Sequence, residues 1–197
     1  MFTLIHEKMV YGRRVEVLAE CFATVIPDDI NILDVGCGDG LVASKIIEKK
    51  KNVNIKGVDI VPRKRGYIDI SMYDGEKLPF ADNQFDAVIF SDVLHHASDA
   101  KKLLIEALRV SSKYIIIKDH LCESPYDDLR LRMMDWVGNA RHGVPLPYKY
   151  FSRAEWNSMF GELELKTDEW IENLELYSFP LNLVFSKGLH FIALLEK

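Results

Sequence analysis

A glycine-rich turn between an apolar run and a helical stretch is the feature that most constrains the fold of this chain. Residues 31–36 read as a short buried strand, the loop Gly36-Cys37-Gly38-Asp39-Gly40 follows, and residues 41–51 show helical spacing with lysines at the end. Alternating glycines let the backbone turn tightly and approach a ligand closely, because they carry no Cβ. A strand, a tight turn and a helix in this order predict the first unit of an α/β fold.

The same alternation continues along the chain. Further strands are predicted at residues 54–60, 85–91 and 114–118. A helix is predicted at residues 99–110, between the last two of these strands. Strands that alternate with helices favour a parallel sheet with right-handed crossovers and helices on both faces. We therefore predict a Rossmann-like, doubly wound α/β sheet.

The two ends of the chain complete this picture. Residues 1–27 are expected to form an N-terminal helix, which Pro27 ends, and Ser152 with Glu155 predicts a capping box at the start of a later helix. Segments 163–176 and 190–195 are expected to pair as antiparallel strands. We find no repeat and no flexible linker, so residues 1–197 are expected to form a single domain.

Composition narrows the class of function. Twenty-five Lys and Arg against 30 Asp and Glu give a net charge of −5, which disfavours nucleic acid as a partner. Three widely spaced cysteines predict neither a disulfide framework nor a metal site. No apolar run approaches the ~20 residues that span a bilayer, and the start does not read as a signal peptide. We expect a cytoplasmic protein without stable membrane insertion.

Acidic residues follow the glycine-rich loop at informative places. Asp59 ends the second predicted strand about twenty residues after the loop, where an acid binds the ribose hydroxyls of an adenine nucleoside. Asp74 lies ahead of the 85–91 strand and could accept a hydrogen bond from an adenine amino group. Taken alone, Asp59 would fit a solvated turn better than a ligand contact.

Taken together, the ordered motifs resemble a known family. The segments 32–40, 57–60, 74–80 and 85–96 look like the successive motifs of class I S-adenosylmethionine (SAM)-dependent methyltransferases. They most resemble the branch that includes ubiquinone/menaquinone-biosynthesis and other small-molecule methyltransferases. The resemblance covers roughly residues 30 to 120 and implies a seven-stranded sheet with an antiparallel last strand, and SAM as the cofactor.

The resemblance also implies a cofactor site. Asp34 and the Gly36 to Gly38 backbone would hold the methionine part of SAM, with Cys37 against the cofactor, and Asp59 would hold the ribose. The remaining implied contacts are Ile60, Asp74 and Gly75 at the adenine, Ser91 and Asp92 on the methionine side, and His96 packed around the cofactor.

Two other functions stay in view. A nicotinamide dehydrogenase is also Rossmann-like, but its fingerprint requires a third glycine where this chain has Leu41. A non-catalytic SAM-binding or methyltransferase-like partner protein would keep the cofactor residues without turnover. We favour methyl transfer to a small-molecule acceptor, because Ser91-Asp92-Val93-Leu94 replaces the Asp/Asn-Pro-Pro-aromatic motif of enzymes that methylate amide or exocyclic nitrogen.

The acceptor side is defined less sharply. His120 follows the strand over 114–118 and is the preferred general base, although a histidine that caps a nearby carbonyl is an equal alternative. Residues 119–152 would cap the acceptor, and Trp136 in that cap would be a core anchor or part of the acceptor contact. The residues expected to grip a flat or partly anionic acceptor are Asn139, Arg141, His142, Tyr148 and Tyr150. The apolar segment 177–185 could be a lid, a surface for lipid-like substrates, or the contact of a homodimer.

Overall fold

The computed structural model describes residues 2–62, 65–139 and 146–197, and this part of the chain forms a seven-stranded sheet. The strand order is β3-β2-β1-β4-β5-β7-β6, and the first five strands are parallel. β7 runs antiparallel to both of its neighbours, β5 and β6. The strands are β1 (Asn31–Val35), β2 (Asn54–Asp59), β3 (Ile70–Met72), β4 (Phe85–Ser91), β5 (Ser111–His120), β6 (Lys166–Glu172) and β7 (His190–Glu196).

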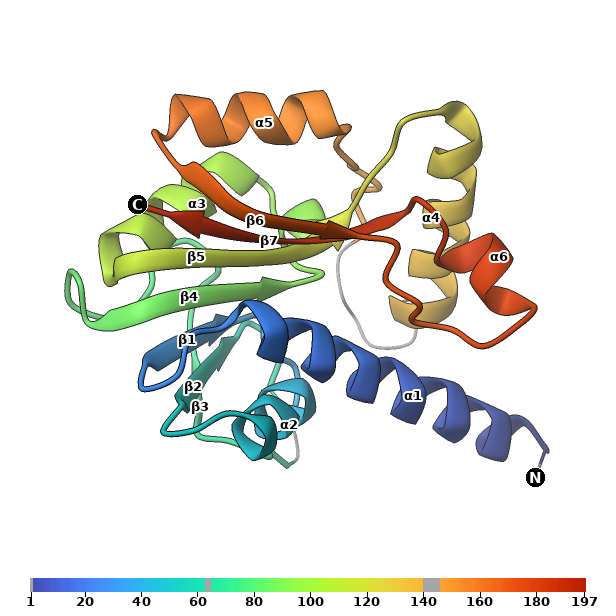
Figure 1. Ribbon diagram of the computed structural model, residues 1–197, viewed down its shortest axis with the longest axis horizontal. Helices are drawn as coiled ribbons and strands as arrows, with labels where there is room; N and C mark the ends of the chain where they lie inside the picture. Colours follow the sequence, from blue (N-terminus) through green and yellow to red (C-terminus); the bar gives the residue numbers. More distant parts are fainter. Residues whose placement is uncertain (1, 63–64, 140–145) are drawn as a thin grey trace.

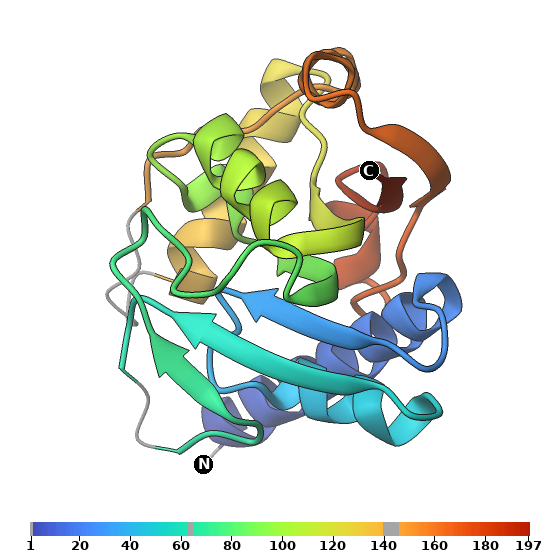
Figure 2. The same cartoon turned by 90° about the vertical axis from the view of Figure 1, so that its left-hand side faces the viewer.

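Helices cover both faces of the sheet, as Figures 1 and 2 show. One face is covered by α1 (Phe2–Val25) and α2 (Leu41–Lys49), and the other by α3 (Ala100–Val110) and α5 (Arg153–Glu162). The short 3-10 helix η1 (Leu94–His96) follows β4. Two further helices, α4 (Pro125–Asn139) and α6 (Leu181–Phe185), lie side by side beyond the carboxyl end of β5 (Figure 1). No described helix combines the length and the apolar character that crossing a membrane requires.

The core has two parts, one on each side of the sheet. Successive strand residues point to opposite faces, so Ile32 of β1 packs with Phe22 of α1, while Leu33 packs on the side of Leu104 of α3. Trp156 of α5 is fully buried in that second part. Burial of both faces explains why the strands read as continuous apolar runs rather than as alternating ones.

Most of the predicted elements are confirmed. The parallel strands, the antiparallel closing pair and the helices on both faces are present, and the seven-stranded sheet with an antiparallel last strand is the one that the resemblance implied. The capping box is also confirmed: Ser152 Oγ accepts from the Glu155 amide, and Glu155 accepts from the Ser152 amide at 2.7 Å. We missed β3, because its three partly exposed residues carry too little pattern.

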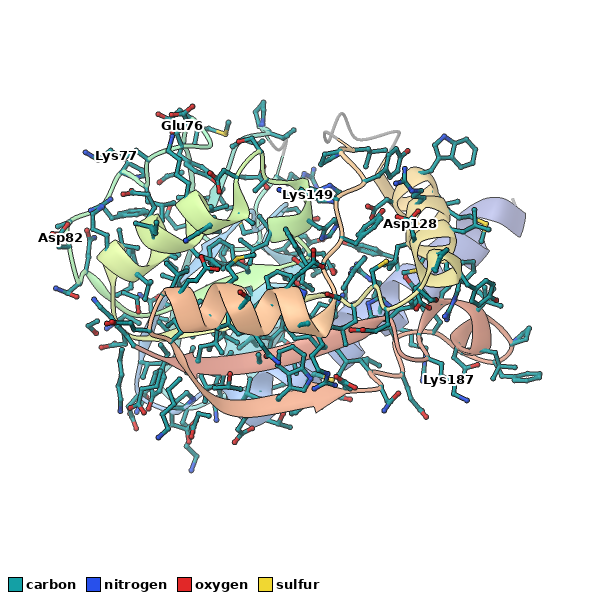
Figure 3. The ribbon with its side chains drawn as sticks, turned by 90° about the horizontal axis from the view of Figure 1, so that it is seen from above. Glu76, Lys77, Asp82, Asp128, Lys149 and Lys187 are labelled. Atoms are coloured by element: carbon teal, nitrogen blue, oxygen red, sulfur yellow. The ribbon has the colours of Figure 1, made fainter. Side chains whose placement is uncertain are left out.

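One side of α4 is unexpectedly apolar and exposed. Trp136 is 63% exposed, so the prediction that it anchors the core is wrong. Figure 3 shows the labelled Asp128 of α4 and the labelled Lys187 at the end of the molecule opposite Asp82. The exposed apolar residues at this end are Tyr126, Leu129, Met133, Trp136 and Val137 of α4, with Phe179, Leu183 and Val184 in and before α6.

Candidate cofactor and acceptor site

The predicted site residues meet at one edge of the sheet. Parallel strands place their carboxyl ends together, so the residues that end β1, β2, β4 and β5 become neighbours although they lie far apart in the sequence. β1 lies between β2 and β4, and the chain crosses from one side of β1 to the other at this point. Such a switch point is where α/β sheets bind their ligands.

Asp59 binds the backbone of the glycine-rich loop. The Asp59 carboxylate accepts the Gly38 amide at 2.8 Å and the Val61 amide at 2.7 Å. Gly38 has φ of +61°, and a Cβ built on it would meet no atom within 4 Å, so the space beside it is available to a ligand. At Gly40, by contrast, a Cβ would clash with Ile68, because it would lie 2.5 Å from Ile68 Cγ1. Packing therefore requires a glycine at this position.

Asp34 is a buried carboxylate without a hydrogen-bond donor at one oxygen. Its Oδ1 has no such partner among the described residues. Burial, together with the nearby charge of Asp59, raises the pKa of Asp34 to about 7. A buried carboxylate in this state is stabilised by a cationic group. The ammonium group of the methionine part of SAM fits that requirement, and the open space at Gly38 fits close approach of a ligand.

The residues expected at the adenine are partly assembled. A Cβ on Gly75 would lie 3.3 Å from Ile60 Cγ2, so these two residues are neighbours, and Ile60 is largely exposed. Asp74 Oδ1 accepts the amides of Glu76 and Lys77, which lower the pKa of Asp74. The Asp74 carboxylate therefore shapes the 74–77 turn and stays ionised.

Cys37 has a packing role that the sequence did not suggest. A Cβ on Gly57 would lie 2.4 Å from Cys37 Sγ, so the thiol packs directly on the glycine in β2. Gly57 is required because Cys37 occupies the space of its side chain. The backbone of Cys37 completes the turn by donating to the Val58 carbonyl at 3.2 Å.

Asp92 is the centre of an ion-pair network that reaches three elements. It follows Ser91 at the end of β4 and contacts the guanidinium of Arg14 in α1 and the ammonium of Lys118 in β5. Although burial opposes ionisation, the charges of Lys118 and Arg14 hold the pKa of Asp92 well below its usual range. The sequence reasoning missed Arg14 and Lys118, because nothing local distinguishes them from the other cations of α1 and β5.

His120 joins the same network. Its Nδ1 lies 3.2 Å from Asp92 Oδ1, and its ring stands edge-on to that of His190 at 5.0 Å between centroids. Burial, with the charge of His95 nearby, lowers the pKa of His120. His120 is therefore a neutral imidazole beside a carboxylate at neutral pH, and it is the last residue of β5 rather than a loop residue.

A second buried cluster surrounds His95. His95 Nδ1 lies 2.6 Å from Asp119 Oδ1, and Asp119 also accepts the amides of Leu94 and His120. Burial opposes protonation, yet the charges of Asp119 and Asp135 raise the pKa of His95 to about 10. The neighbouring His96 is affected in the opposite direction, because burial and the His95 charge lower its pKa to about 4.

The predicted cap contributes one clear contact to this cluster. Tyr150 donates its hydroxyl to Asp135 Oδ2 at 2.6 Å, and its ring stacks over that of His120 at 6.0 Å. Tyr148 instead lies under the guanidinium of Arg132, whose Cζ is 5.1 Å from the ring centroid. Arg141, His142 and the side chain of Asn139 lie outside the described residues.

Comparison with known proteins finds similarity to methyltransferases. Residues 33–114 match the family model described as a methyltransferase domain. The chain is 29% identical over 136 residues to the demethylmenaquinone methyltransferase of Renibacterium salmoninarum, with 62% of this chain and 57% of that protein covered. It is 27% identical to the ubiquinone/menaquinone biosynthesis C-methyltransferase UbiE of Rickettsia bellii, with 76% and 70% covered.

Solved structures share the fold. YcgJ from Bacillus subtilis superposes with a TM-score of 0.63 at 19% identity, over 91% of this chain and 97% of that chain. A chain in the Haloferax volcanii complex between the Trm112 methyltransferase activator and a methyltransferase has a TM-score of 0.69 at 16% identity, over 95% and 92%. The fold, the glycine-rich edge and the match of residues 33–114 to a methyltransferase domain are those of class I SAM-dependent methyltransferases, and the chain resembles that class. Within it, the chain resembles the branch of ubiquinone/menaquinone-biosynthesis methyltransferases.

Proposed function

We propose that this protein transfers a methyl group from SAM to a small-molecule acceptor. The observation that carries the proposal is the buried Asp34 carboxylate, which lacks a donor at Oδ1 and lies beside an open glycine-rich loop. In this proposal Asp34 receives the ammonium group of the methionine part, and the backbone of Gly36, Cys37 and Gly38 lies along it. Asp59, already bound to two amides, turns its remaining lone pairs to the ribose.

The rest of the cofactor site follows the same arrangement. Ile60 and Gly75 flank the adenine, with Asp74 accepting its amino group, while Ser91 and Asp92 line the methionine side. Each side chain comes from the carboxyl edge of a strand or from the loop after it. SAM supplies an activated methyl group on a sulfonium, so positioning of the acceptor, worth about 7–11 kcal/mol of the barrier, matters more than any one base.

His120 is proposed as the base that removes a proton from a hydroxyl or ammonium acceptor. Its neutral ring contacts the Asp92 carboxylate, which would stabilise the imidazolium formed when the ring takes the proton. We expect His120→Ala to lower turnover by about 10²–10⁴-fold with little change in SAM affinity. Full turnover of this variant would remove His120 from the reaction.

The acceptor is proposed to be flat and small, and nucleic acid is not expected. Two relatives are named for methylation in quinone biosynthesis, so demethylmenaquinone and related hydroxylated rings are the first acceptors to test. Residues 119–152 are proposed to cap that acceptor, as part of one domain with the rest of the chain. A homodimer through the exposed residues of α4 and α6 is tested by sedimentation at several protein concentrations.

Calorimetric titration with SAM, S-adenosylhomocysteine and NADPH tests the cofactor. We expect both adenosyl compounds to bind and NADPH not to bind; tighter binding of NADPH would contradict the proposal. Asp34→Asn should abolish SAM binding, whereas Asp69→Asn, at an exposed acid in the loop before β3, is the matched control. Incubation with labelled SAM and the acceptors above then separates an enzyme from a SAM-binding partner protein, the alternative that a neighbour solved with the Trm112 activator keeps in view.

A further inference from the structure

The ring of His95 is fixed through one nitrogen, while its other nitrogen makes no hydrogen bond to the described residues. Its Nδ1 is bound to Asp119 at 2.6 Å, which fixes the ring. Its Nε2 is buried, has no hydrogen-bond partner among the described residues, and faces Asp135 Oδ1 at 3.6 Å. A ring nitrogen of His96 completes a group whose three ligand atoms all lie within 4.8 Å of one another.

The separation between His95 and Asp135 suits two ligands of one metal ion. At 3.6 Å it is longer than the 2.7–3.2 Å expected for an N–H···O hydrogen bond. Two ligand atoms at about 2.0–2.2 Å from a tetrahedral ion lie roughly 3.4 Å apart. The observed separation is therefore close to that of a chelating pair.

Both ligands also have the support that metal sites require. A metal-binding histidine usually donates its second ring N–H to a carboxylate, as His95 does to Asp119. A metal-binding carboxylate is usually hydrogen-bonded in turn, as Asp135 is to the Tyr150 hydroxyl at 2.6 Å. The half-buried His96 lies at the border of the cluster and leaves a way in from solvent.

We propose that His95, His96 and Asp135 bind a divalent transition-metal ion. Two imidazoles and one carboxylate favour ions such as Zn²⁺, Co²⁺ or Fe²⁺ over Mg²⁺ or Ca²⁺, which prefer oxygen ligands. The ion takes the place of the proton on His95 Nε2, which is released to solvent, and its charge of +2 balances Asp119 and Asp135. Three protein ligands leave at least one position open.

Two neighbouring groups of the same kind are poorer candidates. Asp92, His120 and His190 already surround a cation, because the Lys118 ammonium contacts Asp92 and lies 3.3 Å from His190 Nδ1. In the group of His95, Asp119 and His120, Asp119 is already occupied by two backbone amides and the His95 ring. The group with Asp135 is the one whose geometry suits an added ion.

The open coordination position would let the ion bind an acceptor hydroxyl. If the proposed methyl transfer is correct, an acceptor hydroxyl bound there would ionise more readily, because a metal lowers the pKa of a bound oxygen. This consequence rests on the proposed function, whereas metal binding itself does not. His96 would then serve the acceptor rather than pack around the cofactor.

Metal titration of the whole protein tests the site. The protein is stripped with a chelator, dialysed, and titrated with Co²⁺ alone, followed by visible absorption and elemental analysis. We expect about one ion per chain, displaced by Zn²⁺ but not by Mg²⁺, with proton release on binding. His96→Ala and Asp135→Asn should lose the ion, and Tyr150→Phe should weaken it about 10–100-fold.

Controls separate this result from misfolding and from the cofactor site. Asp127→Asn changes another acid of α4, one that pairs with Arg130, and should keep full Co²⁺ uptake. Circular dichroism and SAM titration are measured on each variant, because SAM binding does not require this ion. No stoichiometric Co²⁺ uptake by the wild type, or equal uptake by His96→Ala, Asp135→Asn and wild type, would overturn the site and leave the SAM result untouched.

Discussion

The ammonium group of Lys118 is fully buried and contacts the carboxylate of Asp92, which directly follows the neighbouring strand β4. The same carboxylate meets Arg14 of α1 and His120 of β5. Asp92 therefore neutralises two cations at once and joins the N-terminal helix to the carboxyl edge of the sheet. A buried charge is costly unless it is paired, so the members of this network should differ in what their removal costs.

Removing the charge of Asp92 should destabilise the fold more than removing the charge of Lys118. Asp92→Asn leaves Lys118 and Arg14 without their shared carboxylate and is expected to lower the free energy of unfolding by about 3–5 kcal/mol. Lys118→Met should cost roughly 1–3 kcal/mol, because Asp92 keeps Arg14 and His120. Urea unfolding of both variants measures the difference. Equal losses would show that the Lys118 contact, rather than the whole network, holds Asp92.

Asp34 should make cofactor binding depend on pH. Its pKa of about 7 means that the carboxylate is half-protonated near neutrality, and only the ionised form attracts an ammonium group. SAM affinity should fall about tenfold for each pH unit below 7, and it should fall again above about pH 8, where the α-amino group of SAM loses its proton. Calorimetry between pH 5.5 and 8.5 checks this. A flat profile would place the ammonium elsewhere.

Asp34 should also lower the free energy of unfolding as pH rises. The folded pKa of Asp34 lies above its value of 3.8 in the unfolded chain, so its contribution to stability is lost as pH rises from about 4 through 7. Asp34→Asn should therefore unfold at a higher temperature than wild type above pH 7, with a gain of up to ~4 kcal/mol. The two proteins should converge below pH 4, and a variant less stable at pH 8 would contradict the assignment.

Two glycines of the loop should respond differently to substitution. Gly38→Ala adds a methyl group to open space at positive φ, so we expect a strain of about 1 kcal/mol but a large loss of SAM affinity. Gly40→Ala meets Ile68 as well and should cost a further 1–3 kcal/mol of stability, roughly. Thermal unfolding and SAM titration of both variants separate the effects. Unchanged SAM affinity in Gly38→Ala would show that the cofactor does not approach this loop.

Two leucines of α4 offer a matched test of how that helix packs. Leu131 is fully buried and Leu129 is 64% exposed. Leu131→Ala should cost about 2–5 kcal/mol, because it leaves a cavity. Leu129→Ala should stay within about 0.5 kcal/mol of wild type. A large loss of unfolding free energy for Leu129→Ala would mean that another surface covers this side of α4 in solution.

Much of the fold was predictable from the sequence, because its signals are local. The apolar run at Asn31–Val35, the glycines that follow it and the helical spacing after Leu41 are all set within a few residues. The capping box of Ser152 and Glu155 is equally local. The short β3 could not be found, because three residues on a sheet edge form a strand only through their pairing with β2.

The sequence by itself determined the order of strands and helices, the glycine-rich turn and the acids that follow the strands. Tertiary structure alone decided which side chains share a charge, because parallel strands bring residues from separate elements to one edge. Arg14, Asp92 and Lys118 span more than a hundred residues, and His95 meets Asp135 only once α4 lies beyond β5. Burial and pKa depend on those neighbours, which no local pattern contains.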